Sequence, residues 1–278
     1  MTAVFRTPDD RFANLPEFPF APNYVEDLEG YESMRMHYLD EGPTDAARTF
    51  LCLHGEPTWS YLYRKMLPVF VAAGGRVVAP DLFGFGRSDK PADGGYSFDF
   101  HRNALLRLVE RLDLNNIVIV CQDWGGLLGL TLPLDIASRV GGLIAMNTIM
   151  VAGDIPLPPA FEAWKQWAAD HPDMNIGEAM MFIDGTLPAD VLDAYRAPFP
   201  DYASKAGPRA FPQLVPINEA MDGADTGRRA REWWQQQWRG DALVACGVHD
   251  QILGVPVMEL DRKSTRLNSS HDQSSYAV

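Results

Sequence analysis

The residues with the clearest chemical potential form the run VCQDWGG at positions 120–126. An apolar run leads into it and a helix-like segment follows it. This is the setting of a sharp strand–turn–helix that lifts one side chain above a sheet. The backbone is crowded two residues before and after the central residue of such a turn, and Cys121 and Gly125 are small enough to fit there. Asp123 is therefore the candidate nucleophile.

An aspartate at this position determines the chemistry. A carboxylate is already ionised at neutral pH, so it attacks without a base. It suits displacement at a saturated carbon, which gives an alkyl ester of Asp123. A position at a helix N-terminus also helps to keep the carboxylate charged. An aspartate that only caps a helix is common too, and this motif alone leaves both interpretations open.

A second motif, HGEPTWS at positions 54–60, follows another apolar run. A His-Gly loop in this place commonly supplies a backbone N–H to an oxyanion hole. We expect the N–H groups of Glu56 and Trp124 to be the two donors, whereas the Glu56 side chain is either structural or exposed. The Gly-rich run PDLFGFGRSD at positions 80–89 is expected to be a structural turn.

Taken together, these three motifs resemble those of the haloalkane dehalogenases of the α/β-hydrolase superfamily, in particular the subgroup that includes the 1,2-dichloroethane-hydrolysing enzyme. The resemblance runs from about residue 18 to about residue 258. It implies an α/β-hydrolase fold and hydrolysis of a carbon–halogen bond to an alcohol and a halide. The expected partners are a small halogenated alkane and water, and the expected intermediate is the alkyl ester of Asp123.

A departing halide needs hydrogen-bond donors in a dry pocket, and an indole N–H is such a donor. Trp124 is beside the nucleophile, and the resemblance makes Trp164 the second halide ligand, with Phe161 lining the same cavity. Without the resemblance, Trp164 and Trp167 would be interpreted as core aromatics. The segment before Trp164 is shorter than in the dichloroethane enzyme, and Leu127 replaces an expected aromatic. Substrate preference therefore stays open.

The run ALVACGVHD at positions 242–250 predicts a strand that ends in an acid, Asp250. The resemblance implies that this carboxylate orients a catalytic histidine, although an aspartate in a turn is a simpler interpretation. The histidine should follow one further strand, and the sequence shows no such strand. We therefore expect the base to be absent and ester hydrolysis to be defective. The histidines judged unsuitable are His37, His54, His101, His171, His249 and His271.

Apolar runs bounded by turn residues alternate with helix-like segments, which predicts a mostly parallel, doubly wound α/β sheet. The predicted strands are residues 34–39, 49–53, 76–79, 116–121, 140–146 and 242–247, and the predicted helices are residues 101–112 and 125–137. Residues 151–223 contain helical patterns and no clear strand. They are expected to form a helical cap between core segments 1–150 and 224–260. The last strand and helix of the fold are expected to be missing.

The last stretch, residues 261–278, is polar and rich in serine, which is typical of a disordered tail. Its first part, DRKSTRLNSSH, also resembles the in-frame translation of a short-read sequencing adaptor. We therefore expect this stretch to be foreign to the natural protein.

Composition narrows the class of protein further. The net charge of −13 disfavours nucleic acid and anionic membranes as partners. Cys52, Cys121 and Cys246 lie in apolar runs, which favours free thiols in a reducing compartment. The chain shows neither a signal core nor a membrane-length apolar run. We expect a cytoplasmic monomer, and we expect no metal or cofactor because no metal-ligand spacing or phosphate loop appears.

Two other functions remain open from the sequence. An epoxide hydrolase also uses an aspartate at this kind of turn, with tyrosines of the cap as donors, and Tyr195 and Tyr202 are candidates. A hydrolase-like protein that binds a ligand without catalysis would also lack the histidine.

Overall fold

The computed structural model describes residues 4–183, 185–247 and 249–259; the tail at 261–278, with His271, lies outside them. The strands are β1 (Val4–Phe5), β2 (Asn23–Val25), β3 (Met36–Glu41), β4 (Thr49–Leu53), β5 (Arg76–Pro80), β6 (Lys90–Pro91), β7 (Ile117–Gln122), β8 (Val140–Met146) and β9 (Asp241–Ala245). The α-helices are α1 (Leu67–Ala72), α2 (Phe98–Arg111), α3 (Trp124–Gly129), α4 (Pro133–Ile136), α5 (Pro159–Asp170), α6 (Ile176–Ile183), α7 (Ala189–Arg196), α8 (Ala206–Leu214) and α9 (Ala224–Gln236). Short 3-10 helices cover Asp9–Phe12, Ser60–Tyr63, Ala137–Arg139 and Ala203–Lys205.

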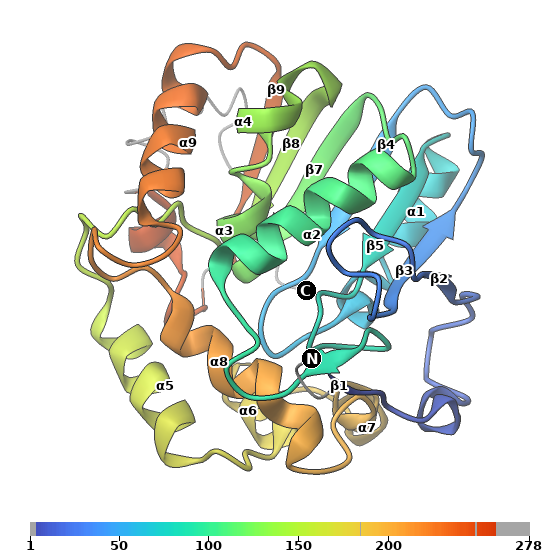
Figure 1. The fold of residues 1–278 in the computed structure, drawn as a ribbon, viewed down its shortest axis with the longest axis vertical. Coiled ribbons are helices and arrows are strands. Elements are labelled where there is room, and N and C mark those ends of the chain that lie inside the picture. Colours follow the sequence, from blue (N-terminus) through green and yellow to red (C-terminus); the bar gives the residue numbers. More distant parts are fainter. Residues whose placement is uncertain (1–3, 184, 248, 260–278) are drawn as a thin grey trace.

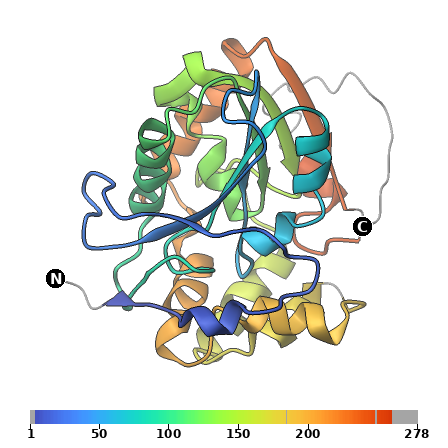
Figure 2. The same ribbon diagram turned by 90° about the vertical axis from the view of Figure 1, so that its right-hand side faces the viewer.

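A twisted seven-stranded sheet forms the centre of the molecule, in the order β2-β3-β5-β4-β7-β8-β9. The five strands from β5 to β9 in this order are parallel, and β2 and β3 are antiparallel to their neighbours. Helices α2, α3, α4 and α9 cover one face of the sheet and α1 covers the other (Figures 1 and 2). The predicted α/β class with a mostly parallel sheet is confirmed.

Burial on both faces explains why the central strands were predictable. All five residues of β4 are buried, as are the first five of β7. A parallel strand covered by helices on both sides carries a continuous apolar run instead of an alternating pattern. The predicted helix over residues 125–137 was wrong in its continuity, because α3 ends at Gly129 and a separate helix, α4, begins at Pro133. Proline has no N–H to continue an existing helix, but it fits the first turn of a new one.

Residues 151–223 contain α5, α6, α7 and α8 and, in their described part, no strand. Figure 1 shows these helices gathered at the end of the sheet where β7 leads into α3. Helix α5 packs against α8, and α6 packs against α7. In the described residues, no helix is both long enough and apolar enough to span a membrane.

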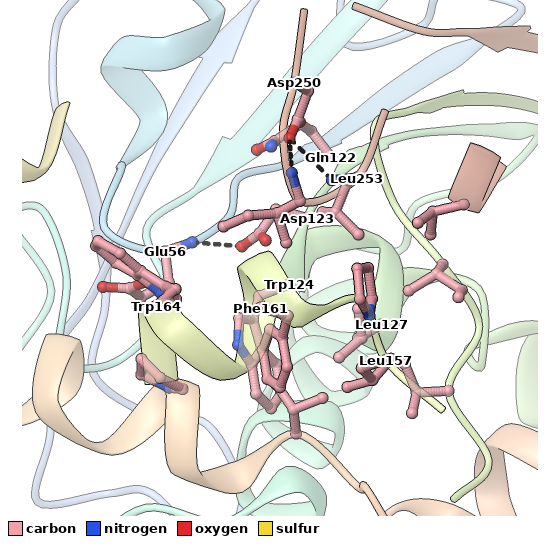
Figure 3. A pocket seen from close by; sticks show the side chains of 17 residues that line it. Glu56, Gln122, Asp123, Trp124, Leu127, Leu157, Phe161, Trp164, Asp250 and Leu253 are labelled. Carbon is pink, nitrogen blue, oxygen red and sulfur yellow. Dashed lines mark hydrogen bonds between the residues drawn. The ribbon is translucent and has the colours of Figure 1, made fainter. Parts of the chain in front are cut away.

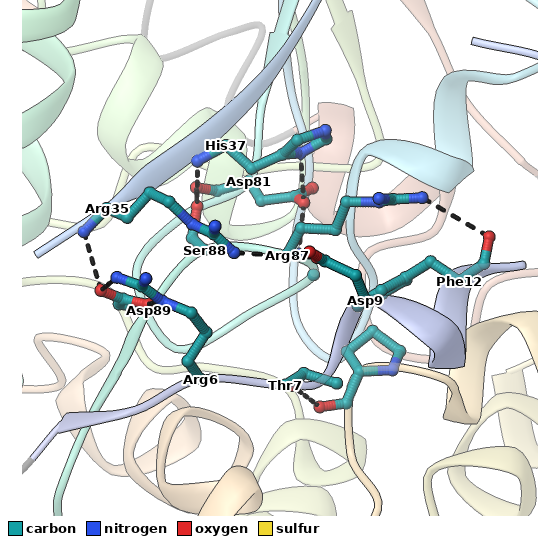
Figure 4. A network of polar contacts seen from close by, with 12 residues as sticks. Arg6, Thr7, Asp9, Phe12, Arg35, His37, Asp81, Arg87, Ser88 and Asp89 are labelled. Atoms are coloured by element: carbon teal, nitrogen blue, oxygen red, sulfur yellow. Dashed lines mark hydrogen bonds and ion pairs between the residues drawn. The ribbon is translucent and has the colours of Figure 1, made fainter. Parts of the chain in front are cut away.

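A buried polar network fixes the Gly-rich turn after β5 (Figure 4). The Asp81 carboxylate accepts hydrogen bonds from His37 Nδ1 at 2.7 Å and from the backbone N–H of Ser60 and Arg87 at 2.7 and 2.8 Å. Burial acts to raise the pKa of Asp81, but His37 and the backbone donors outweigh it and lower the value to about 2. Gly86 has φ +49°, and a Cβ there would collide with the Asp81 carboxylate. The turn is therefore structural.

Candidate active site

Asp123 lies between β7 and α3 in a conformation that few side chains adopt. Its φ is 51° and its ψ is −125°. A non-glycine residue with positive φ is strained, and strain of this kind gathers at functional sites. Two glycines make the turn possible. A Cβ on Gly125 would collide with the Leu53 carbonyl, and a Cβ on Gly55 would collide with the Asp123 side chain.

Two backbone donors hold the Asp123 carboxylate. The N–H of Glu56 donates to Oδ1 at 2.8 Å, and the backbone N–H of Trp124 also donates to the carboxylate. These are the two donors that the sequence analysis selected. Burial raises the pKa of Asp123 to about 6, and the charge of Asp250 acts in the same direction, whereas the two N–H donors lower it. The carboxylate is thus ionised at neutral pH and poorly hydrated.

The carboxylate faces a cavity of about 90 Å³ that is lined mainly by apolar side chains (Figure 3). Trp124, Phe161 and Trp164 all line it, as the sequence analysis expected. Leu127, at the position where an aromatic was expected, lines it as well. This cavity is small, because typical small-molecule pockets are several times larger.

The two tryptophans approach the cavity from different parts of the fold. Trp124 begins α3 and packs against Phe211 of α8, with 4.7 Å between ring centroids. Trp164 lies on α5 and stacks on Trp167 at 5.1 Å. The Trp164 side chain also hydrogen-bonds to the carboxyl of Glu56. Trp167 does not line the cavity, whereas Trp164, which the resemblance to the family selected, does.

Asp250 lies in the loop after β9 and also lines the cavity. Its Oδ1 accepts the backbone N–H groups of Ile252 and Leu253, both at 2.8 Å, and its Oδ2 accepts Asn147 Nδ2 at 3.0 Å. Asn147 directly follows β8, and its own Oδ1 accepts the N–H of Gly247 at 2.7 Å. Sequence reasoning missed Asn147. The available signal was a polar residue at the end of the strand next to the one that leads into Asp123.

Among the described residues, no histidine lines the cavity. His37 is bonded to Asp81, and the His54 ring accepts the Leu82 N–H at 3.0 Å. His101 packs against Phe211 with 4.7 Å between ring centroids. His171 lies near the carbonyl of Trp167, at 2.8 Å from Nδ1. The part of the chain that the structure describes contains no group of three or more acidic, His or Cys side chains that could hold a metal ion.

The two cap tyrosines that an epoxide hydrolase would need do not line the cavity. Tyr195 is buried edge-on against Tyr61, with 5.3 Å between ring centroids. Tyr202 is 50% exposed and lies under the Arg209 guanidinium. In the described residues, the donors to the Asp123 carboxylate are the backbone N–H groups of Glu56 and Trp124.

The parallel sheet, the strained turn at Asp123 and the two N–H donors define an α/β hydrolase, and the family model of the α/β hydrolase fold matches residues 48–263. The chain is 48% identical to a haloalkane dehalogenase of Psychrobacter cryohalolentis, over 82% of this chain and 76% of that protein. It is 40% identical to a haloalkane dehalogenase of Mycolicibacterium paratuberculosis, over 96% of this chain and 92% of that protein. The tetrameric structure of haloalkane dehalogenase DpaA from Paraglaciecola agarilytica NO2 superimposes with a TM-score of 0.91 at 50% identity, covering 94% of this chain and 88% of that chain.

This chain therefore belongs to the haloalkane dehalogenases of the α/β-hydrolase fold. The resemblance seen in the three sequence motifs is confirmed. The expectation of a monomer is untested for this chain, and DpaA is described as tetrameric.

Proposed function

We propose that this protein breaks the carbon–halogen bond of small haloalkanes, with Asp123 as the nucleophile. The observation that carries the proposal is the Asp123 carboxylate itself, which is held by two backbone N–H groups and faces a small apolar cavity. In the reaction, a carboxylate oxygen forms a bond to the saturated carbon while the carbon–halogen bond breaks. The bonding pair leaves with the halide, and the product is an alkyl ester of Asp123.

The leaving halide requires donors that act where its charge develops. We assign this role to the indole N–H groups of Trp124 and Trp164, which line the cavity from the core and from α5. Phe161 and Leu127 supply apolar walls that exclude water. We also interpret residues 151–223 as a cap over a core made of residues 1–150 and 224–260, because α5 and α8 close the cavity above Asp123.

Hydrolysis of the ester is the second step. The N–H groups of Glu56 and Trp124 already point at the carboxylate, so they would stabilise the tetrahedral oxyanion that forms when water attacks. Asp250 is held rigidly enough to orient an imidazole and to stabilise its charged form. No histidine of the described residues lines the cavity. We therefore propose that the described site carries out alkylation and lacks the base for hydrolysis.

Product analysis tests the proposal against the epoxide hydrolase alternative. The folded protein is incubated with short 1-bromoalkanes or with epoxides of the same chain length, and bromide and diol are measured. We expect bromide release, no diol, and no release from the Asp123→Asn variant. Diol formation without bromide release would overturn the proposed function.

A further inference from the structure

The side chain of Glu56 has no role in the mechanism above, yet it lies in the same cavity. It is only 8% exposed, and its Oε1 has no hydrogen-bond partner among the described residues. Its backbone N–H is committed to Asp123, so the carboxyl is fixed next to the nucleophile. Figure 3 shows the Glu56 side chain adjacent to the Trp164 indole.

Two other buried acids, Asp81 and Asp89, have imidazole or cationic partners. The Asp123 carboxylate is held by two backbone N–H groups, whereas, among the described residues, the Glu56 carboxyl has only the indole of Trp164. Asp81 is paired with His37, and Asp89 with Arg6 at 2.6 Å. No ion pair among the described residues includes Glu56. An unpaired charge in an apolar site is very costly, so such a group keeps its proton. Burial raises the pKa of Glu56 well above its usual value, and the charge of Asp123 raises it further, whereas the Trp164 hydrogen bond lowers it.

Because the Glu56 carboxyl contacts Trp164, its protonation state affects whether an anion can bind there. An indole has a single N–H and no acceptor. The Trp164 N–H therefore cannot serve the Glu56 carboxyl and a halide equally well. A neutral acid is a weak acceptor that releases this donor, whereas a carboxylate would retain the donor and repel the anion.

We propose that the side chain of Glu56 must carry a proton for a halide to bind between Trp124 and Trp164, and that it holds the Trp164 indole N–H while no halide is present. Glu56 is then a positioning residue for halide release, distinct from its backbone N–H. The proposal rests on the proposed function, because it assumes that the two indoles receive the halide.

Other charged groups lie near Glu56, and their effects on anion binding must be separated from its own. Asp123 faces it from the turn between β7 and α3, and Asp250 lines the same cavity from the loop after β9. The lining residues from α5 and α8 are uncharged. His54, on the same loop, is bonded to the Gly55 carbonyl and the Leu82 N–H. Ionisation of Asp123 also repels a halide, so its effect must be separated from that of Glu56.

Bromide binding to the full chain provides this separation. The saturable quenching of tryptophan fluorescence is measured from pH 5 to pH 10 at constant ionic strength. The variants are Glu56→Gln, Asp123→Asn and Trp164→Phe. Glu162→Gln is the matched control, because it makes the same side-chain substitution at an exposed position of α5. Asp250 is present in every variant, so its effect is common to all of them.

In the wild type we expect bromide affinity to fall in two steps, one near pH 6 from Asp123 and one at higher pH from Glu56. Above each pKa the affinity should fall by up to about tenfold per pH unit. Glu56→Gln should lack only the upper step. Asp123→Asn should lack the lower step and show the Glu56 step at a lower pH than in the wild type, because the charge that raises the Glu56 pKa is gone. Glu162→Gln should show both steps. An upper step that persists in Glu56→Gln would overturn the proposal.

Two further outcomes are informative. If no saturable quenching occurs in the wild type, the halide site fails, and with it both the proposed function and this inference. If Glu56→Gln does not fold, proton uptake by the wild type is measured with a pH indicator as bromide is added at a pH within the upper step. Proton uptake on bromide binding that persists in the Asp123→Asn variant supports the proposal, and its absence in both proteins contradicts it.

Discussion

The backbone N–H of Glu56 lies 2.8 Å from Oδ1 of Asp123, although 67 positions separate the two residues in the chain. The contact joins the loop after β4 to the turn after β7, two neighbouring parallel strands of the sheet. Gly55 and Gly125 allow this close approach, because a Cβ on either would collide with the opposite segment. The position of the Asp123 carboxylate thus depends on backbone geometry at two strand ends.

In the proposed mechanism, the pKa of Asp123, at about 6, sets the pH dependence of alkylation. Only the ionised carboxylate attacks, so the single-turnover rate should rise about tenfold per pH unit below pH 6 and level off above it. The rate of bromide release from 1-bromobutane between pH 4.5 and pH 8 measures this profile. A flat profile in folded protein would contradict the role of the buried carboxylate.

Asp123→Asn should stabilise the fold at neutral and alkaline pH. The pKa of Asp123 is higher in the folded state than in the unfolded state. Burial of the ionised carboxylate therefore opposes folding once the pH exceeds the pKa of Asp123 in the unfolded chain. The gain should be roughly 1–3 kcal/mol at pH 8 and should shrink towards pH 4. Urea unfolding at both pH values measures it. A variant that is less stable than the wild type at pH 8 would disprove this account of the site.

Asp81→Asn should have the opposite effect. The pKa of Asp81 is lowered to about 2 by its contacts with His37 and the backbone donors. The carboxylate therefore adds stability above pH 4 that is lost as the pH falls towards 2. We expect a loss of about 3–5 kcal/mol at pH 7, as for a broken buried pair, and a smaller difference at pH 3. An equal difference at the two pH values would show that the charge of Asp81 is not involved.

Trp164→Phe should impair alkylation far more than folding, because it removes one N–H donor and keeps most of the apolar volume. Loss of one donor to a developing charge costs about 2.7–4 kcal/mol, which corresponds to roughly 10²–10³ in rate. Trp167→Phe is the matched control, since Trp167 stacks on Trp164 outside the cavity. Equal rates in the two variants would show that Trp164 only packs.

The sequence predicted the central strands and the position of Asp123 because both depend on local patterns. Buried parallel strands such as β4 appear as apolar runs, and the turn at Asp123 requires small residues at fixed spacing. The break between α3 and α4 was also visible in principle, because Pro133 marks it. The resemblance to a known family supplied the choice of Trp164 over Trp167, which spacing alone left open.

The features that could not be predicted are contacts between distant segments. Asn147 holds Asp250 across 103 positions, and no periodic pattern records that pairing. The contact between Glu56 and Trp164 joins a loop of the core to α5 and depends on how the helices of residues 151–223 pack. The two-residue strands β1 and β6 pair with each other and are too short to show any alternation.

The covalent step is tested most directly by mass spectrometry. The folded full chain is incubated with 1-bromobutane, and its intact mass, its peptide map and the released bromide are measured. We predict a butyl ester on Asp123 and about one bromide released per chain, because the described residues supply the nucleophile and donors but place no histidine on the cavity. Repeated bromide release without an accumulating adduct would contradict the proposed lack of a base. Folded protein that releases no bromide and carries no adduct would contradict the assignment of Asp123 as the nucleophile.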